Sequence, residues 1–302
     1  MSTLLQILVH DIVPIFVVIG LGYAFTRRTR PELRTVSRLT FYLLSPALVF
    51  YSLVQSDVAG SELVQIAAFT ALMVVIMGVL ARGAAHVLGL NPRQVAGFLL
   101  AVMFVNGGNY GLGVNRLAFG PEVEARAVIY FVTSSILVYT LGVAVASGFE
   151  GGWRGTLKQL ITLPHVYAML AALIVRIFGW DVPQPVMAGI QLPAQAAIPM
   201  MLLLLGAQLA YASVGAYWKP ALAGSALRLI VAPPIALLIA GALALDGPAR
   251  QAAILQSSMP AAVINTILAA EYDSEPQLVT GLVVVSTLIS PLTLTLLIAL
   301  LK

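Results

Sequence analysis

The sequence contains no cysteine and only three histidines, and these shortages exclude several kinds of functional site. Without cysteine the chain can form no disulfide framework, thiolate metal site or thiol nucleophile. His10, His86 and His165 are too widely separated to match a metal-ligand motif. The phosphate-binding loop of ATP-driven transporters, with its Gly-Lys-Ser or Gly-Lys-Thr ending, is also missing. The sequence therefore predicts no metal, no cofactor and no enzymatic activity.

Charged residues are scarce too, and their scarcity indicates that the protein is surrounded mainly by lipid. They make up 9% of the 302 residues, and hydrophobic residues make up 60%. Soluble domains have about 25% charged and about 45–50% apolar residues. We therefore expect a multi-pass protein of the cell (inner) membrane with the lipid bilayer as a partner. In so apolar a chain, the net charge of +4 does not indicate nucleic-acid binding. The first residues lack the basic segment of a signal peptide, so the first apolar run should be retained.

Ten apolar runs follow one another, and each approaches the length of about 20 residues that a membrane-spanning helix needs. The pattern predicts an all-α integral membrane fold with ten transmembrane helices. We expect them near Leu4–Phe25, Leu39–Val54, Leu63–Ala81, Gln94–Leu117, Ala127–Ala146, Leu160–Phe178, Met187–Tyr211, Ala221–Leu243, Ala249–Ala270 and Leu278–Leu301.

Basic residues predict how the helices are oriented. The linker after the first run carries Arg27, Arg28, Arg30, Arg34 and Arg38, and the alternate linkers hold more Lys and Arg than those on the opposite side. Basic linkers remain in the cytoplasm. We therefore expect the first linker in the cytoplasm and both termini on the non-cytoplasmic side.

Two pairs of landmarks suggest an internal repeat. Pro46 and Pro199 are 153 positions apart, and so are Phe119 and Tyr272. Two five-helix halves, about 1–147 and about 158–302, would account for the shared offset, although chance matching of apolar residues is the alternative. An odd number of helices makes the second half enter the membrane upside down, which gives the inverted repeat typical of secondary transporters.

The fourth and ninth runs each contain an interruption. The fourth holds four glycines and two asparagines between Asn106 and Gly113, and the ninth holds Gln256-Ser257-Ser258-Met259-Pro260. Glycines weaken a helix, and proline removes a backbone donor. We expect both helices to break, with Ser258 capping a new half-helix that starts near Pro260. The alternative is that the glycines only permit close helix packing.

Paired interruptions indicate a transport site near the middle of the membrane. The N-terminus of a half-helix offers free N–H groups and about half a positive charge, so two of them would attract an anion. The candidate substrate-binding residues are Asn106, Gly107, Asn109, Tyr110, Gly111, Ser257, Ser258, Met259, Pro260 and Asn265. Gln208, Gln256 and Arg228 are candidates for residues that support the site through their charge or structure. A charged arginine within the membrane has a high energetic cost, so a function is expected for Arg228. It could attract the anion or bind the carbonyl end of a broken helix, but we favour a purely structural contact between helices.

Several motifs run through the whole chain, including FYLLSPAL at 41–48, NYGL at 109–112, GAQL at 206–209, MPAA at 259–262 and STLISPLT at 286–293. With these motifs the chain resembles a bacterial member of the auxin efflux carrier family, which also contains the plant PIN carriers. Gly113 departs from the pattern, since relatives more often have proline there.

The resemblance implies a fold like those of bile-acid symporters and the antiporter NhaA, in which broken helices four and nine cross. Helices one, two, six and seven would form a scaffold, and helices three to five and eight to ten a transport domain. A homodimer through the scaffold is one assembly that it allows. The implied substrate is a small organic anion, either auxin-like or a mono- or dicarboxylate, carried by alternating access. A channel and a transporter-like receptor are the alternatives; an intramembrane enzyme fits less well, because no base accompanies Ser257 and Ser258.

Overall fold

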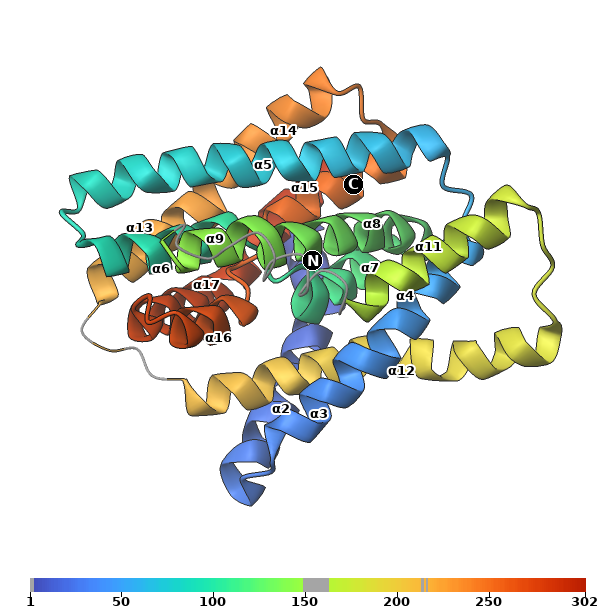
Figure 1. The fold of residues 1–302 in the computed structure, drawn as a ribbon, viewed down its shortest axis with the longest axis horizontal. Coiled ribbons are helices and arrows are strands. Elements are labelled where there is room, and N and C mark those ends of the chain that lie inside the picture. The colour runs from blue at the N-terminus through green and yellow to red at the C-terminus, as the bar shows by residue number, and fades with distance from the viewer. Residues whose placement is uncertain (1–2, 149–162, 213–214, 216) are drawn as a thin grey trace.

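The computed structural model describes residues 3–148, 163–212, 215 and 217–302. Within these ranges the chain is helical and contains no strand (Figure 1). Seven helices are long and apolar enough to cross a membrane by length and composition, and they correspond to seven of the ten expected runs. The chain is thus a multi-pass membrane protein, as its composition predicts.

The long helices consist of one element, or of several elements joined without a gap. In chain order they are α1 (Thr3–Ile7), η1 (Leu8–Ile12) and α2 (Val13–Thr29); α3 (Leu33–Leu39), η2 (Thr40–Leu44) and α4 (Ser45–Val54); α5 (Gly60–Val87); α8 (Pro121–Leu137), η4 (Val138–Gly142) and α9 (Val143–Ala146); α12 (Gln184–Tyr211); α13 (Trp218–Ala226), η5 (Leu227–Val231) and α14 (Ala232–Ala242); and α17 (Pro276–Leu301).

Three of the wide π-helical turns, labelled η, come just before a proline. η1, η2 and η5 precede Pro14, Pro46 and Pro233. Proline has no N–H group, and its ring clashes with the carbonyl four residues earlier, so the preceding turn widens. The helices continue through these prolines, with the widened turn absorbing the clash.

The remaining three expected runs have a different form. The fourth is split into α6 (Pro92–Met103), then η3 (Gly107–Leu112) with α7 (Gly113–Phe119), and the ninth into α15 (Gly247–Ser257) and α16 (Ile264–Glu271). The sixth gives α11 (Pro164–Ile177), and residues 160–162 of that run lie outside the described residues. Both expected interruptions are therefore present in the structure.

The helices pack in two groups. In the first group α12 packs against α2 and α4, and α4 packs against α11; α5, α6, α8, α13, α15 and α17 form the other group (Figure 1). The closest approach in the first group is between α2 and α12, where a side-chain carbon on Gly206 would overlap the carbonyl oxygen of Ile19. The backbones touch there because glycine has no side chain, as at other close helix contacts in membranes.

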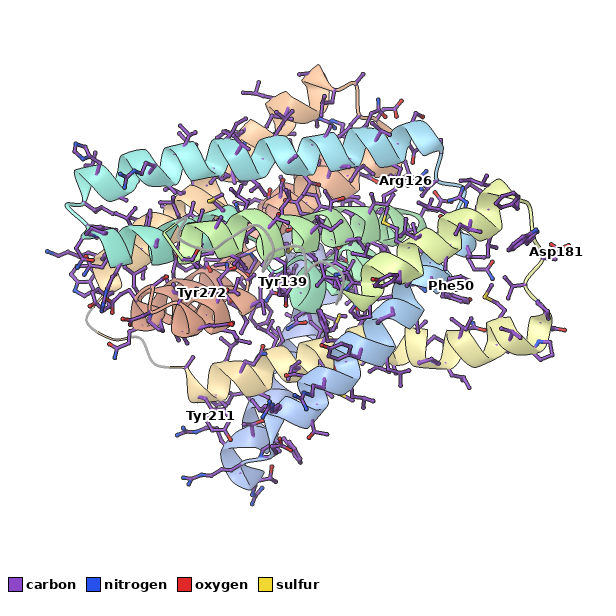
Figure 2. All side chains as sticks on the ribbon, viewed as in Figure 1. Phe50, Arg126, Tyr139, Asp181, Tyr211 and Tyr272 are labelled. Carbon is purple, nitrogen blue, oxygen red and sulfur yellow. The ribbon has the colours of Figure 1, made fainter. Side chains whose placement is uncertain are left out.

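Apolar side chains cover much of the outer surface (Figure 2). Val17, Val79 and Leu238 are 55%, 68% and 74% exposed, as expected where lipid is the solvent. A partly buried ion pair joins two of the helices. Arg126 of α8, labelled in Figure 2, contacts Glu62 of α5 at 2.7 Å.

Candidate functional site

The two interrupted helices cross through short extended segments. Val105 and Ala261 form an antiparallel bridge. The Asn106 N–H donates to the Pro260 carbonyl at 2.8 Å, and the Ala262 N–H donates to the Phe104 carbonyl at 3.1 Å. Backbone groups in a membrane must find partners within the protein. Each break therefore supplies the partners that the other break needs.

The second half-helix of the ninth run begins later than the sequence suggested. α16 starts at Ile264, with Val263 at its N-cap position, and Ser258 does not cap it. Ser258 instead donates its hydroxyl proton back to the Ile254 carbonyl at 2.7 Å, at the end of α15. The expected Ser258 cap is thus wrong. Residues near Pro260 stay extended because they pair with the other broken helix, and this partner outweighs local capping.

Arg228 binds the carbonyl ends of both first half-helices. Its guanidinium donates to the Val102 carbonyl of α6 at 3.1 Å, to the carbonyl of Ser257, the last residue of α15, and to that of Met259 just beyond it. The side chain is 1% exposed. A helix C-terminus carries about half a negative charge, so one cation serves two helix ends. Binding to the carbonyl end of a broken helix is one of the roles that the sequence allowed for Arg228.

Two amide side chains connect the breaks further. Gln256 donates its Nε2 protons to the carbonyls of Gly107 and Ala127, each at 3.3 Å. Asn265 donates from Nδ2 to the Phe104 carbonyl at 3.0 Å. Both residues are fully buried and act on the backbone of the crossing.

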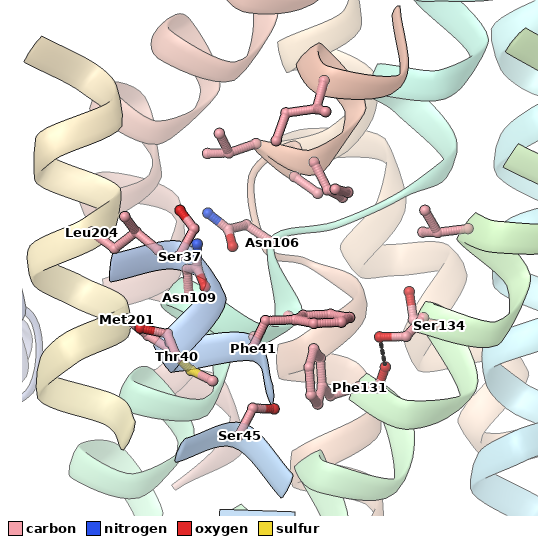
Figure 3. A pocket seen from close by; sticks show the side chains of 18 of the residues that line it. Ser37, Thr40, Phe41, Ser45, Asn106, Asn109, Phe131, Ser134, Met201 and Leu204 are labelled. Carbon is pink, nitrogen blue, oxygen red and sulfur yellow. Dashed lines mark hydrogen bonds between the residues drawn. The ribbon is translucent and has the colours of Figure 1, made fainter. Parts of the chain in front are cut away.

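A cavity of about 360 Å³ lies beside the crossing, between the two groups of helices (Figure 3). It reaches the N-termini of η3 and α16, because Gly107, Gly108, Val263 and Ile264 line it. The remaining lining residues come from helices on both sides of the crossing: Ser37, Arg38, Thr40, Phe41, Tyr42, Ser45, Val105, Asn106, Asn109, Phe131, Ser134, Ser135, Val138, Tyr139, Met201, Leu204, Gln208, Ala262 and Ile267.

Four of the sequence-predicted residues line this cavity, namely Asn106, Gly107, Asn109 and Gln208. Figure 3 shows Asn106, Asn109 and Ser37 directed to the same part of it. The other candidates are not among its described lining residues: Tyr110, Gly111, Ser257, Ser258, Met259, Pro260, Asn265, Arg228 and Gln256. Tyr110, for example, is fully buried, and its hydroxyl lies 3.1 Å from that of Ser290.

The cavity is positively charged, and some of its polar atoms have no partner. Arg38 lines it, and no aspartate or glutamate belongs to the described lining. Asn106 Nδ2, Ser45 Oγ and Gln208 Oε1 are buried without a hydrogen bond. Unpartnered buried groups are costly, so a polar ligand would be stabilised by them. The Asn106 amide and the Ser45 hydroxyl can donate to an anion, as can the two helix N-termini, whereas Gln208 Oε1 can only accept from a donor group.

A second cavity of about 460 Å³ adjoins the first. The two share Ser37, Gln208, Val263 and Ile267 as lining residues. The second extends to Arg34, near the start of α3. Together they lead from the crossing toward the arginine-rich linker.

The sequence is similar to those of known membrane transport proteins. A family model described as membrane transport protein matches residues 7–149 and 154–298. An uncharacterized transporter of Methanothermobacter thermautotrophicus is 29% identical over 259 residues, 85% of each chain. A second uncharacterized transporter, from Methanocaldococcus jannaschii, is 24% identical over 276 residues, covering 87% of this chain and 88% of the relative. Auxin efflux carrier component 8 of Arabidopsis thaliana is 26% identical over 160 residues, covering 51% of this chain and 42% of that protein.

Proposed function

Because the chain belongs to the membrane transport protein family of the auxin efflux carriers, we propose that it is a secondary carrier for an organic anion with an apolar body. That it is a membrane transporter and not an enzyme follows from the family itself. The substrate, the site and the mechanism are the proposal.

One observation carries the proposal: the cavity reaches the N-termini of two half-helices at the same crossing. Each N-terminus has N–H groups without a partner inside its helix and about half a positive charge. A carboxylate near Asn106 and Asn109 would receive backbone N–H and side-chain amide donors together. No buried lysine is needed to hold it.

The rest of the cavity indicates what is attached to the carboxylate. Phe41, Phe131, Met201, Leu204 and Ile267 give it mainly apolar walls. Apolar walls with a few polar groups are typical of sites for small amphipathic ligands. Arg38 also lines the cavity and would attract the anion over a longer range.

The packing of the helices supports transport by alternating access. The cavity lies between the group with α4 and α12 and the group with the crossing and α8, so relative motion of the two groups would expose it to one side or the other. In this proposal the first group is the scaffold and the second is the transport domain. With the arginine linker in the cytoplasm, the cavities face inward and both termini lie outside.

The test is saturable uptake of aromatic carboxylates, such as indole-3-acetate, into proteoliposomes. We expect Asn109→Ala to weaken substrate affinity by about 10- to 150-fold, since one hydrogen bond to a charged group is worth about 1.5–3 kcal/mol. Asn109→Asp should abolish binding through charge repulsion. Ser257→Ala is the matched control, because Ser257 belongs to the same crossing but not to the cavity lining; it should retain wild-type affinity.

Uptake that does not saturate would favour a channel, and binding without uptake would favour a receptor. Wild-type affinity in a folded Asn109→Asp variant would contradict the proposed site. Equal affinity for the protonated and ionised forms of the substrate, measured across its carboxyl pKa, would contradict anion recognition.

A further inference from the structure

His165 is a buried polar side chain that the proposed function leaves without a role. It lies in the first turn of α11 and is 0% exposed. Among the described residues, neither Nδ1 nor Nε2 has a hydrogen-bond partner. A buried donor or acceptor without a partner costs about 1–3 kcal/mol. A histidine that served only to fill the core would be expected to bond at least one nitrogen.

Its neighbours connect this imidazole to the cavity. The ring centroid of Phe41 lies 5.3 Å from that of His165 at an interplanar angle of 85°, and the centroid of Phe131 lies at 5.2 Å and 36°. Both phenylalanines line the cavity, and so does Ser45, whose buried hydroxyl oxygen also lacks a partner. His165 therefore lies directly behind the aromatic wall of the cavity.

The aromatic rings can provide a partner for only one of the two imidazole nitrogens. Burial without a counter-charge favours neutral imidazole, which has one N–H donor and one acceptor nitrogen. An N–H can point at the face of a neighbouring ring in a weak hydrogen bond. The other nitrogen is an acceptor, and the negative face of a phenyl ring offers it nothing. The missing partner is thus a hydrogen-bond donor.

The wall also sets the distance between this acceptor and the helix N-terminus. Phe131 packs so closely against Gly108 that a β-carbon added to this glycine would lie 2.7 Å from Phe131 Cε2. A single aromatic ring therefore touches both the N-terminal turn of η3 and His165. A ligand that entered between Phe41 and Phe131 would have one ring's width between its carboxylate and the imidazole.

We propose that His165 is a specificity-determining residue, which accepts a hydrogen bond from an N–H or O–H group at the end of the substrate opposite the carboxylate. This inference rests on the proposed anion site. It narrows the substrate class to carboxylates whose apolar body ends in a hydrogen-bond donor. Phe41 and Phe131 move apart to admit that end.

Three ligands of nearly equal size test the inference: phenylacetate, 4-hydroxyphenylacetate and 4-methoxyphenylacetate. Only the second has a donor at its far end. We expect the full-length protein to bind it at least about tenfold more tightly than the methoxy compound, since sites built around a hydrogen bond reject analogues that lack the donor. His165→Phe should reduce this ratio to about one, and His165→Gln, which keeps an acceptor, should preserve part of it. His86→Phe is the control, because His86 is exposed at the end of α5.

The outcomes separate the two proposals. If the wild-type protein binds the hydroxy and methoxy compounds equally well, or if His165→Phe keeps the wild-type ratio, the role of His165 is refuted and the anion site remains. The wild-type comparison needs no variant, so it holds even where His165→Phe fails to fold. If none of the three ligands nor indole-3-acetate binds, the proposed function fails, and the role of His165 fails with it.

Discussion

Replacing Arg228 with leucine should destabilise the protein more than removing a charge from an exposed ion pair. The change leaves the carbonyls of Val102, Ser257 and Met259 without their donor. An unpartnered buried acceptor costs about 1–3 kcal/mol. Part of this cost is offset, because the guanidinium no longer has to be buried away from water. We therefore expect a net loss of about 3 kcal/mol in the free energy of unfolding.

The assay is thermal unfolding of the purified protein in detergent. A loss of this size lowers the apparent Tm by about 5 °C in a protein of this length. Arg228→Lys keeps the charge but loses the planar fork that reaches both helix ends, so its Tm should fall by less. Arg93→Leu is the matched control: Arg93 forms a 2.8 Å ion pair with Asp273, but its side chain is 71% exposed. Exposed pairs contribute about 0–1 kcal/mol, so this Tm should hardly change.

Two results would refute this account of Arg228. One is a Tm for Arg228→Leu that equals that of Arg93→Leu. The other is a folded Arg228→Lys variant that has lost substrate affinity while keeping its stability, because that combination would place the guanidinium on the substrate.

Two further predictions concern contacts between distant parts of the chain. Lys302 and Asp11 form a 2.6 Å ion pair between α17 and η1, and a double-mutant cycle with Lys302→Ala and Asp11→Asn should give a coupling energy of about 1 kcal/mol; a coupling of zero would show that the pair adds no stability. Gly206→Ala should lower the Tm by several degrees because the new carbon overlaps the Ile19 carbonyl, at an overpacking cost of about 1–3 kcal/mol. Gly20→Ala, where no atom lies within 4 Å, is its control, and equal Tm values for the two variants would contradict the close contact.

The helices and the positions of the breaks could be predicted from the sequence because both depend on local properties. Long apolar runs define membrane spans, and clusters of helix-weakening residues mark the breaks: the glycines and asparagines around Gly107 and Gly108, and the two serines before Pro260. The start of α16 could not be found this way. It depends on the pairing of Val105 with Ala261, residues 156 positions apart, which overrides the local capping preference of Ser258.

Only four of the residues that line the cavity were predicted, and the others were missed for the same reason. Asn106 and Asn109 stood out because polar residues are rare in a membrane span. Phe41 and Phe131 gave no such signal, since an aromatic residue in an apolar helix most often packs in the core. Arg38 entered the sequence argument only as a marker of orientation, and its place in the cavity depends on how α3 packs beside α12.

The charges at the crossing explain why its strongest cation does not line the cavity. Four half-helix ends meet there, and each C-terminus carries about half a negative charge and each N-terminus about half a positive charge. Arg228 bonds to the carbonyl ends, so its single charge balances the two C-termini. The two N-termini, together worth about one positive charge, have no acidic partner among the described lining residues. A bound monoanion would therefore balance the crossing, and an arginine directed into the cavity would leave the carbonyl ends uncompensated.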